Sequence, residues 1–434
     1  LSHNVASKAG GGAHVSLLES VLVLADTAVV NNTAPWRGGG VFAYGCSVAV
    51  SGSAVVSNNG VAQATSLPEL VPGDDVHEPE SVSGAGLGGG VYCLSDVAEL
   101  GVPVLGVSGA SVVVRENNAT FGGGLFADGC ALNVSSGATV EDNGATVDGG
   151  GLFGRVATVS VSAITCRGNF AGGAGGGLGV DHGTSGSVTS STLRNNVAVG
   201  PGGAVHWRDL AQPLTEAGNT FSGNAAVYGP DHATHVARLQ LLSEPPNIPY
   251  ASGLEVADPW VLGLVDFYGQ PAVTANALVT LTVPNAVVRG GVESAVAGVA
   301  RFGKVAVTAY PGIPQNMTFS IRSLPLVTPA LDSIIIRACL PGEFLVGEIC
   351  LLCETGTYSD VPNAPRCSKC APRTYAPNRG MAACLPCPQS SSASAPPSAA
   401  FGSVGSASSV FSFSVTRILD FCERHLEGVT RLLD

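Results

Sequence analysis

Small and branched apolar residues alternate with polar residues through the first half of the chain. One face of the segment SVAVSGSAVV carries Val48, Val50, Ala54 and Val56. The corresponding face of ALNVSSGATV carries Leu132, Val134, Ala138 and Val140, and that of TVSVSAITC carries Val159, Val161 and Ala163. Alternation with a period of two among β-branched residues predicts strands that are buried on one side.

A glycine triplet followed by two apolar residues separates these segments. It occurs as GGGVF at Gly38, GGGVY at Gly88, and GGGLF at Gly122 and Gly149, with weaker copies as GGAH at Gly11, GGGLG at Gly175 and GGAV at Gly202. From Gly122 onward the intervals are 27, 26 and 27 residues, whereas those from Gly38 and Gly88 are 50 and 34 residues. An insertion rich in Pro, Asp and Glu, from about Pro68 to Ser83, accounts for much of the longest interval. A fixed period in this range is typical of a solenoid.

Asparagine recurs ahead of the glycines, at Asn31–Asn32, Asn58–Asn59, Asn117–Asn118, Asn143, Asn169 and Asn195–Asn196. Asparagine tolerates left-handed backbone, and aligned asparagines can hydrogen-bond to one another along a stack. Glycine is needed where a coil bends with positive φ or where backbones crowd. We therefore predict an all-β chain in which residues 1–242 form a right-handed parallel β-helix. Each turn of about 27 residues makes strands that pair with the next turn, about 4.8 Å away.

Two other architectures share parts of this pattern. A flexible Gly/Ser chain would explain the composition but does not require apolar residues in register. A leucine-rich repeat has a similar period and an asparagine position, but leucine is scarce here and the L-x-x-L-x-L signature is absent. The parallel β-helix is therefore favoured.

The asparagine, the short spacer and the Gly-Gly-apolar turn together resemble the repeat of polymorphic outer-membrane proteins. The resemblance covers roughly residues 10–235, where both elements recur in phase. Members of that family are surface-exposed β-helices with adhesive roles. The resemblance thus implies a β-helical fold and a location at a surface.

Strand-like segments of another kind follow the last glycine triplet. The proline-rich EPPNIPY marks a linker after Leu242, and short apolar runs then recur at roughly ten-residue spacing from Ser252 to Arg337. This spacing predicts a β-sandwich over residues 243–338. LVDFYGQPA and VARFGKVAVTAYPG resemble strands of immunoglobulin-like or filamin-like modules, which implies a spacing or protein-contact role.

Cysteine becomes dense over residues 339–388. A C-x10-C spacing and three CxxC pairs involve Cys339, Cys350, Cys353, Cys367, Cys370, Cys384 and Cys387. Paired CxxC motifs can bind zinc through thiolates. In an exported chain the same density indicates disulfides that staple a module too small to build a core.

The segments CLPGE at Cys339 and GTYS at Gly356–Ser359 resemble ephrin-receptor-like and TNF-receptor-like cysteine-rich modules. This resemblance spans about 50 residues and favours disulfides, so no metal and no cofactor is assigned. The simplest pairing joins Cys339 to Cys350, Cys353 to Cys367 and Cys370 to Cys384, and it leaves Cys387 in need of a partner. Sequence alone leaves the connectivity open.

Three cysteines of the repeat region suggest a further staple. Cys46 and Cys130 each lie eight residues after the first glycine of their triplets, and Cys93 lies on the turn between them. We expect Cys93 to bridge to one of the two. The alternative is that all three are small buried hydrophobes.

Composition narrows the classes of function. The 434-residue chain has only 12% charged residues and a net charge of −12, so it lacks a basic footprint for nucleic acid. The most apolar stretch, Ser16 to Val30, is interrupted by Glu19 and Asp26, and membrane attachment is not expected within this segment. Because Leu1 opens the chain and the repeat is running by Gly10, we expect a fragment of a longer protein.

The sequence also contains glycosylation sequons and a C-terminal tail of different composition. Four N-x-[ST] sequons, which predict glycosylation in a eukaryotic host, begin at Asn31, Asn118, Asn133 and Asn316. Asn133 is expected to point outward because Leu132 and Val134 point inward. Residues 389–434 are a Ser/Ala/Pro/Gly linker ending in Val415–Asp434, whose apolar spacing suggests a short helix or an artefact of gene prediction.

Candidate catalytic residues gather late in the repeats. They are Asp181 and His182, then His206 with Arg208 and Asp209, then Asp231 with His232 and His235. Polysaccharide lyases and glycosidases with this fold need converging carboxylates, or a carboxylate with Arg or Lys. Neighbouring turns could bring the three aspartates together, but Asp and His are also ordinary in solvated turns. No catalytic residues are therefore assigned.

Calcium is a further candidate ligand. GGLGVDHG, from Gly176 to Gly183, partly matches a calcium nonapeptide, but it occurs once and lacks the apolar residue after the aspartate. The acidic residues of the insertion are Asp74, Asp75, Glu78 and Glu80. A solvated loop explains them at least as well, so no metal site is assigned.

The sequence therefore predicts a non-catalytic extracellular or cell-surface scaffold. Its expected partner is an unidentified protein or carbohydrate at a cell surface. The alternative is a carbohydrate-active β-helix enzyme.

Overall fold

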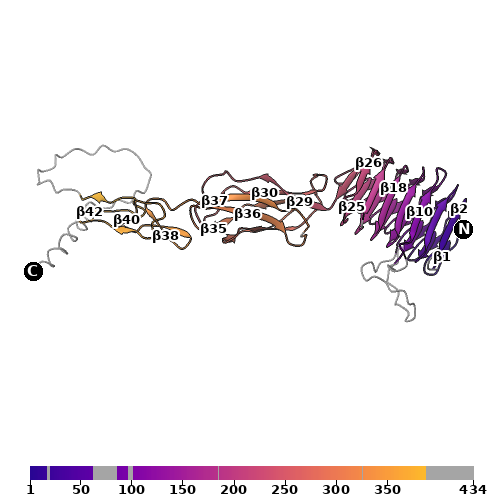
Figure 1. Ribbon diagram of the computed structural model, residues 1–434, viewed down its shortest axis with the longest axis horizontal. Helices are drawn as coiled ribbons and strands as arrows, with labels where there is room; N and C mark the ends of the chain where they lie inside the picture. The colour runs from indigo at the N-terminus through magenta and orange to yellow at the C-terminus, as the bar shows by residue number, and fades with distance from the viewer. Residues whose placement is uncertain (17–19, 62–85, 96–100, 184, 325, 388–434) are drawn as a thin grey trace, which may run out of the picture.

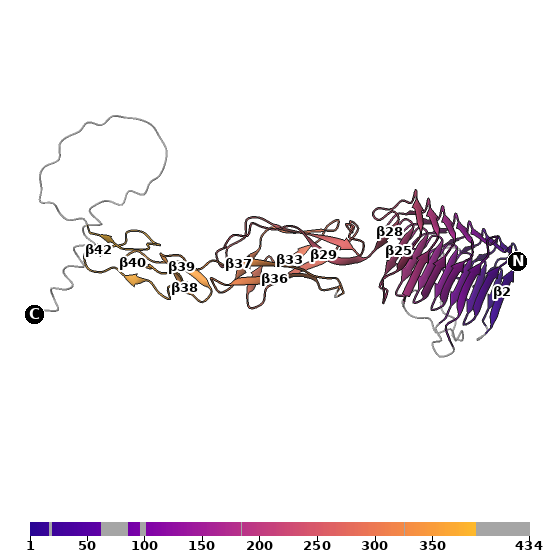
Figure 2. The ribbon, with the colours of Figure 1, turned by 45° about the horizontal axis from the view of Figure 1, so that its top comes forward.

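The structure is a computed structural model that describes residues 1–16, 20–61, 86–95, 101–183, 185–324 and 326–387. The acidic insertion with Asp74, Asp75, Glu78 and Glu80, and the tail with Val415–Asp434, lie outside these residues. All elements of the described part are β-strands. A parallel solenoid, a set of antiparallel sheets and a cysteine-rich module follow one another in a row (Figure 1; Figure 2).

Four parallel sheets run along the solenoid, and each pairs a strand with its equivalent one coil away. Sheet 1 consists of β1 (Ala13–Val15), β5 (Val41–Tyr44), β9 (Val91–Leu94), β13 (Leu125–Asp128), β17 (Leu152–Arg155), β21 (Leu178–Asp181), β25 (Val205–Arg208) and β28 (His232–Thr234). Sheet 2 consists of β2 (Val21–Ala25), β6 (Ser47–Ser51), β10 (Val104–Ser108), β14 (Ala131–Ser135), β18 (Thr158–Ser162), β22 (Ser185–Thr189) and β26 (Thr215–Ala217).

The two remaining sheets are made of shorter strands. Sheet 3 consists of β3 (Ala28–Val30), β7 (Val55–Ser57), β11 (Val113–Arg115), β15 (Thr139–Glu141), β19 (Thr165–Arg167), β23 (Thr192–Arg194) and β27 (Thr220–Ser222). Sheet 4 consists of β4 (Thr33–Ala34), β8 (Gly60–Val61), β12 (Asn118–Ala119), β16 (Gly144–Ala145), β20 (Phe170–Ala171) and β24 (Val197–Ala198).

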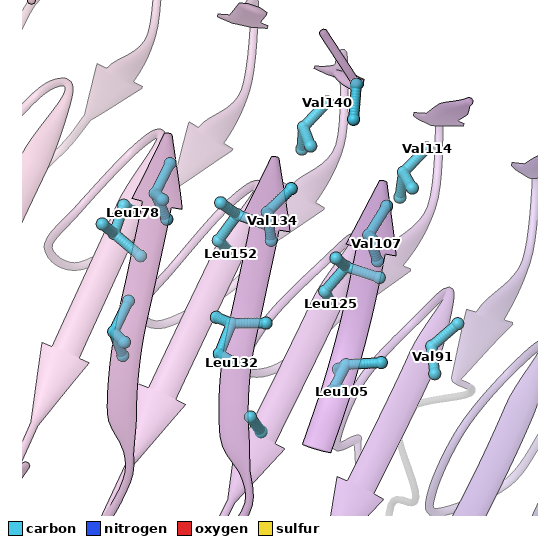
Figure 3. Close-up of a cluster of buried hydrophobic side chains, with 14 of the residues drawn as sticks. Val91, Leu105, Val107, Val114, Leu125, Leu132, Val134, Val140, Leu152 and Leu178 are labelled. Atoms are coloured by element: carbon cyan, nitrogen blue, oxygen red, sulfur yellow. The ribbon is translucent and has the colours of Figure 1, made fainter. Parts of the chain in front are cut away.

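The alternating apolar residues form the interior of the solenoid. In sheet 1, Leu125, Leu152 and Leu178 pair in register from coil to coil. Leu132 pairs with Val159 in the same way in sheet 2. Figure 3 shows such side chains from three sheets converging on one interior. Burying a residue of this size contributes about 1.5–3 kcal/mol relative to exposure, so stacking coils stabilises what one coil cannot.

A ladder of buried asparagines fixes the register of the coils. In each step the side-chain Nδ2 donates to Oδ1 of the asparagine one coil further on, at 2.9–3.2 Å. The members are Asn4, Asn32, Asn59, Asn117, Asn143, Asn169, Asn196 and Asn224. The predicted hydrogen bonding along the stack is confirmed.

Each internal amide of this ladder uses its full hydrogen-bonding capacity. Asn143 Oδ1 accepts from Nδ2 and from the backbone N–H of Asn117. Asn143 Nδ2 donates to Asn169 Oδ1 and to the carbonyl of Val114. Two donors and two acceptors are thereby satisfied inside the protein, which a buried amide requires.

The glycines meet both of the demands predicted for them. Gly122, the first of its triplet, has φ 60°. A Cβ on Gly123 would lie 2.3 Å from the carbonyl oxygen of Gly144, and a Cβ on Gly124 would lie 2.6 Å from that of Gly151. The triplet thus combines a left-handed bend with two positions where neighbouring backbones leave no room for a side chain.

The two residues of each asparagine pair have different structural roles. Asn31, Asn58 and Asn195 have φ between 53° and 56°, and each directly precedes a ladder asparagine. In the other coils this left-handed position is held by His3, Glu116, Asp142, Gly168 or Gly223. Asn117 is therefore the ladder residue of its pair, while Asn118 is exposed.

One predicted inward residue is wrong. Ala163 is exposed with φ 50°, and Ile164 is buried in its place. Two residues, Ser162 and Ala163, separate the buried Val161 from the buried Ile164. In the preceding coil three residues separate the corresponding buried pair, Val134 and Ala138. The shorter turn shifts the alternation by one residue, so the inward side changes.

The antiparallel part begins earlier than predicted. The sequence places residues 236–242 in the repeats, but they belong to a strand that pairs antiparallel with β30, so the last strand of the solenoid is β28. One sheet contains β29 (Val236–Ser243), β30 (Trp260–Asp266) and β34 (Val299–Phe302). A second contains β33 (Val292–Ser294), β31 (Leu278–Thr282), β36 (Pro314–Ile321) and β37 (Ala330–Ile335), and a third pairs β32 (Val287–Arg289) with β35 (Ala306–Thr308).

These antiparallel sheets share one core, as a sandwich requires. Trp260 and Leu262 of β30 belong to the same buried cluster as Phe319 of β36. Trp260 donates from Nε1 to Asp332 Oδ2 at 2.7 Å, which satisfies its polar atom. The second core is separate from that of the solenoid.

The cysteine-rich module is built from three short hairpins. Their strands are β38 (Glu343–Val346), β39 (Ile349–Leu352), β40 (Thr357–Tyr358), β41 (Ser368–Lys369), β42 (Thr374–Tyr375) and β43 (Leu385–Pro386). Disulfides join Cys339 to Cys350, Cys353 to Cys367 and Cys370 to Cys384. Cys387 is also disulfide-bonded. Arg337 makes a two-fold hydrogen bond with Glu343 at 2.7 and 2.9 Å where the module begins.

A fourth disulfide lies in the solenoid. Cys93 of β9 is bonded to Cys130, as one of the two bridges expected from sequence. Cys46 keeps its thiol, which contacts the carbonyl of Val15. Cys166 is buried without a disulfide.

Replacing Asn143 by alanine should lower the free energy of unfolding of the solenoid by about 3 kcal/mol. The substitution leaves the Val114 carbonyl and the Asn117 amide groups buried without their partner, and each such group costs about 1–3 kcal/mol. Chemical denaturation measures the change. Asn133→Ala is the matched control, because Asn133 is exposed and a surface change should stay within about 0.5 kcal/mol. Equal effects of the two substitutions would refute the ladder.

Candidate functional site

Sheet 1 carries a row of aromatic side chains on its outer face. His14, Phe42, Tyr92, Phe126 and Phe153 occupy the same register position in successive coils, and we call them the ring row. Neighbouring ring centroids are 4.8–5.4 Å apart. His14 is exposed, but Phe42, Tyr92, Phe126 and Phe153 are buried in one cluster with Leu87, and Phe121 packs against it. These four rings therefore form a small core outside the coil rather than an open stacking platform.

A row of alternating charges runs beside the rings. Asp128, Arg155, Asp181 and Arg208 pair in register, and we call them the charged row. Arg155 is ion-paired with Asp128, and Arg208 with Asp181. Both carboxylates are at least nine-tenths buried, so their partners are needed to stabilise the charge.

A third row covers the rings from the side of the glycine triplets. Its members stand directly before the first glycine at this corner of each coil, and we call them the covering row: Leu87, Phe121, Asp148, Ala174, Pro201 and Tyr228. Leu87 and Phe121 are large and apolar. The later members of the row are smaller or polar, so they do not extend the apolar cover over sheet 1.

A cavity of about 300 Å³ opens where these rows change character. Beyond Phe153 the ring row continues as Gly179 and His206. The walls are formed by Asp148, Gly173, Ala174, Gly200, Pro201, His206, Arg208, Tyr228, His235, Val236, Thr274 and Ala275. Thr274 and Ala275 belong to the antiparallel part, so the cavity lies at a junction of two modules. Ligand pockets are common at such junctions.

The junction is held by the turn that follows β30. Tyr268 stacks on His232 with ring centroids 4.1 Å apart, and its hydroxyl donates to Glu216 Oε1 at 2.7 Å. Trp207, which belongs to the solenoid core, donates from Nε1 to the same hydroxyl at 3.0 Å. The turn thus covers the open end of the solenoid, where unpaired strand edges would otherwise be exposed.

A buried carboxylate supports this turn. Asp266 is fully buried and accepts from the backbone N–H of Thr234 at 3.2 Å and of Gln270 at 2.8 Å. Gln270 in turn donates from Nε2 to the carbonyl of His232 at 2.8 Å. The bonds to Thr234 and to the His232 carbonyl cross between the two modules and hold the junction at which the cavity lies.

Inside the cavity the ionisable groups are perturbed by burial. Burial raises the pKa of Asp148, although the Ala174 N–H that donates to its Oδ1 opposes the shift. Burial also lowers the pKa of His206 to about 3, helped by the charges of His235 and Arg208. His206 is therefore neutral at physiological pH, and its Nε2 has no hydrogen-bond partner among the described residues.

Arg208 supplies donors to the same cavity, whereas the hydroxyl of Tyr228 already donates to the carbonyl of Thr234 at 2.8 Å. Burial works to raise the pKa of Asp181, but Arg208 and His182 outweigh it and the pKa is lowered. Asp181 thus stays ionised and holds Arg208 in place. Burial and the charge of Asp266 raise the pKa of Tyr228 to about 12, so its hydroxyl stays protonated.

The structure brings some of the sequence candidates together. His206, Arg208 and His235 line the cavity, and Asp181 pairs with Arg208 from outside it. His182 lies between two aspartates, with Nδ1 2.6 Å from Asp181 Oδ1 and Nε2 3.6 Å from Asp209 Oδ2. Ligand atoms of these three residues lie within 4.8 Å of one another. Because Arg208 already neutralises Asp181, no metal is assigned there.

Other candidates lie elsewhere. Asp231 does not join Asp181 and Asp209, because it precedes β28 instead of following it. It accepts from Asn224 Nδ2 at 3.0 Å at the end of the asparagine ladder. His232 belongs to the junction, 3.3 Å from Glu216 Oε2. In the partial calcium motif, Gly179 packs against Phe153 and Asp181 pairs with Arg208, so the repeat itself explains these residues.

Sequence reasoning missed Asp148, Tyr228 and Thr274. It also missed the ring row and the charged row, although both left a signal. The rings stand four residues after the first glycine of their triplets, and the alternating charges stand six residues after it.

Comparison with known protein families, curated proteins and solved structures finds no match for this chain. Within the described part, no helix is long and apolar enough to cross a membrane.

Replacing His206 by glutamine should flatten the dependence of solenoid stability on pH. A folded pKa of about 3 lies below the value of about 6.5 for an unfolded histidine, so acid favours unfolding through the window between them. At pH 5 the wild-type histidine should cost about 2 kcal/mol relative to pH 7, because only the unfolded chain takes up the proton. Thermal unfolding of both proteins at pH 7, 6 and 5 measures the difference. His3→Gln, at an exposed position, should retain the wild-type slope, and a parallel slope for His206→Gln would contradict the assignment.

Proposed function

We propose that this chain is an extracellular or cell-surface scaffold that binds a ligand without transforming it. The single observation that carries the proposal is the set of groups around the cavity. Asp148 is the one carboxylate among the described lining residues. Glycoside hydrolysis by the usual mechanism needs two carboxylates flanking the bond, one of them as acid. A cavity with one carboxylate favours binding over hydrolysis. Elimination by a lyase would need a carboxylate together with an arginine or lysine, and the one arginine among the described lining residues, Arg208, is already ion-paired with Asp181.

The charged row supports the same conclusion. Asp128 and Asp181 lie close to the surface of sheet 1, where a substrate groove would be expected. Each is neutralised by an arginine one coil away. An ion-paired carboxylate of lowered pKa, such as Asp181, is a weak base and a poor proton donor at neutral pH.

Location outside the cytosol is supported by the disulfides. Four bonds join described cysteines, three of them in the cysteine-rich module. Such bonds persist in oxidising compartments and are rare in the cytosol. The sequons agree, because Asn31, Asn118, Asn133 and Asn316 are all exposed. We propose that they carry glycans if the host is a eukaryote.

The adhesive role rests on the arrangement of the modules. The solenoid lies at one end of the row and the cysteine-rich module at the other (Figure 1). The resemblances to polymorphic outer-membrane proteins, to immunoglobulin-like modules and to ephrin-receptor-like modules suggest the same task. In this proposal the smaller modules hold the solenoid and its cavity away from the surface to which the protein belongs.

Secreted protein should contain the four disulfides in the pairing described above. Non-reducing peptide mapping of the full chain tests this, and it should recover Cys93 linked to Cys130 as well as the three bonds of the cysteine-rich module. Reduction should unfold the cysteine-rich module first, because hairpins this small bury too little apolar surface to fold without staples. Free thiols in the module, or zinc found by elemental analysis, would overturn the extracellular assignment.

The purified chain should bind cell surfaces and release no sugar from polysaccharides. Binding is measured by flow cytometry with labelled protein, and hydrolysis or elimination by assays of reducing ends and of unsaturated products. The wild type should give only background levels of reducing ends and of unsaturated products, and Asp148→Asn should leave both at that level. Turnover by the wild type that Asp148→Asn removes would establish the enzyme instead, and absence of surface binding would refute the scaffold.

A further inference from the structure

We propose that the cavity at the junction binds a neutral, hydroxyl-rich ring of the size of one sugar residue. This inference rests on the proposed ligand-binding function and names the site and the chemical class of the ligand.

The shape of the cavity limits what it can hold. A volume of about 300 Å³ lies at the lower end of the range for ligand pockets. Gly173, Ala174, Gly200 and Pro201 form walls without long side chains, and Tyr228 adds an aromatic face. A single ring fits this space, whereas an extended chain could place only its terminal unit inside.

The polar groups match hydroxyls, which donate and accept hydrogen bonds at the same atom. Asp148 is an acceptor with one oxygen already bonded to the Ala174 N–H. Arg208 offers only donors. His206 Nε2 is buried without a partner among the described residues, so a ligand hydroxyl there would remove the cost of an unsatisfied polar atom. Adjacent hydroxyls of one ring could bond to such groups together.

The charges argue against ionic ligands. Arg208 is the nearest cation, but Asp181 already pairs with it, so little positive charge remains for a phosphate, a sulfate or a uronate. An anion would also lie near Asp148. An ammonium ligand would lie near the guanidinium of Arg208. A neutral polar ring avoids both repulsions.

The predicted glycosylation sites leave the cavity side of sheet 1 uncovered. The sequons lie elsewhere: Asn31 lies between β3 and β4, Asn118 in sheet 4, Asn133 in sheet 2 and Asn316 in β36. Glycans at these positions would project from other parts of the surface than sheet 1. The cavity would therefore remain accessible on a glycosylated protein.

Saturation-transfer NMR and calorimetry on the full chain test the proposal directly. The probes are the methyl pyranosides of glucose, galactose, mannose and N-acetylglucosamine, with glucuronate and glucosamine as charged counterparts. At least one neutral glycoside should bind, and it should bind at least tenfold more tightly than either charged counterpart. A preference for glucuronate or glucosamine, or no binding of any probe, would overturn the proposal.

Three variants place the binding in the cavity. Asp148→Asn should weaken binding of the best probe at least tenfold, because the amide replaces one acceptor oxygen by a donor. Ala174→Phe should abolish it by extending the covering row as Phe121 does in an earlier coil. Asp209→Asn is the matched control, since this aspartate is exposed and outside the cavity, and its affinity should stay within twofold of the wild type.

The two proposals fail in distinguishable ways. Cell-surface binding that survives Asp148→Asn and Ala174→Phe, without binding of any glycoside, would refute the sugar pocket and keep the scaffold. Should Ala174→Phe fail to fold, as shown by its thermal midpoint, Asp148→Asn and Asp209→Asn still decide the matter. Equal loss of affinity in these two variants would locate the sugar elsewhere and overturn the assignment.

Discussion

The asparagine ladder is the interaction on which the rest of the structure depends. A buried amide is costly unless both of its donors and both of its acceptors are used. In this solenoid each internal ladder residue can meet that demand only if the coils before and after it lie in the same register. A slip of one residue would leave amides unpaired and would turn the apolar side chains outward. The ladder therefore specifies the register as well as stabilising it.

A shared register on the inside imposes one on the outside. Residues at a fixed distance from the glycines stack in rows, which is why rings, alternating charges and covering residues each form a line along sheet 1. A local change of composition then has a spatial consequence. Where Phe121 gives way to Asp148 and Ala174, and Phe153 to Gly179, the outer core ends and a cavity begins. The proposed binding site therefore lies where the repeat is interrupted.

Much of the fold was predictable because the repeat encodes it locally. The glycines, the asparagines and the alternating apolar residues are each explained by geometry within one coil or by contacts with the next coil. The ladder and the parallel sheets could therefore be predicted from the sequence. The prediction that Ala163 points inward was wrong because the turn after Val161 is one residue shorter than in the preceding coil. This shortening changes which residue is buried, and the spacing of the glycine triplets does not reveal it. The cavity was harder, because Thr274 and Ala275 reach it from another module. Asp231 follows Asp209 by 22 residues, close to one repeat, but it bonds to Asn224 at the end of the ladder.

The central claim is that all coils share one register, and distances between spin labels test it most directly. Ala25, Ser51, Ser108 and Ser135 are successive partners in sheet 2, and Ser162, Thr189 and Ala217 continue the row. With one label on Ala25 and the other on Ser162, Thr189 or Ala217, double electron–electron resonance should give about 19, 24 and 29 Å, one strand spacing per coil. Separations that fail to rise by a constant step of about 4.8 Å would contradict the account.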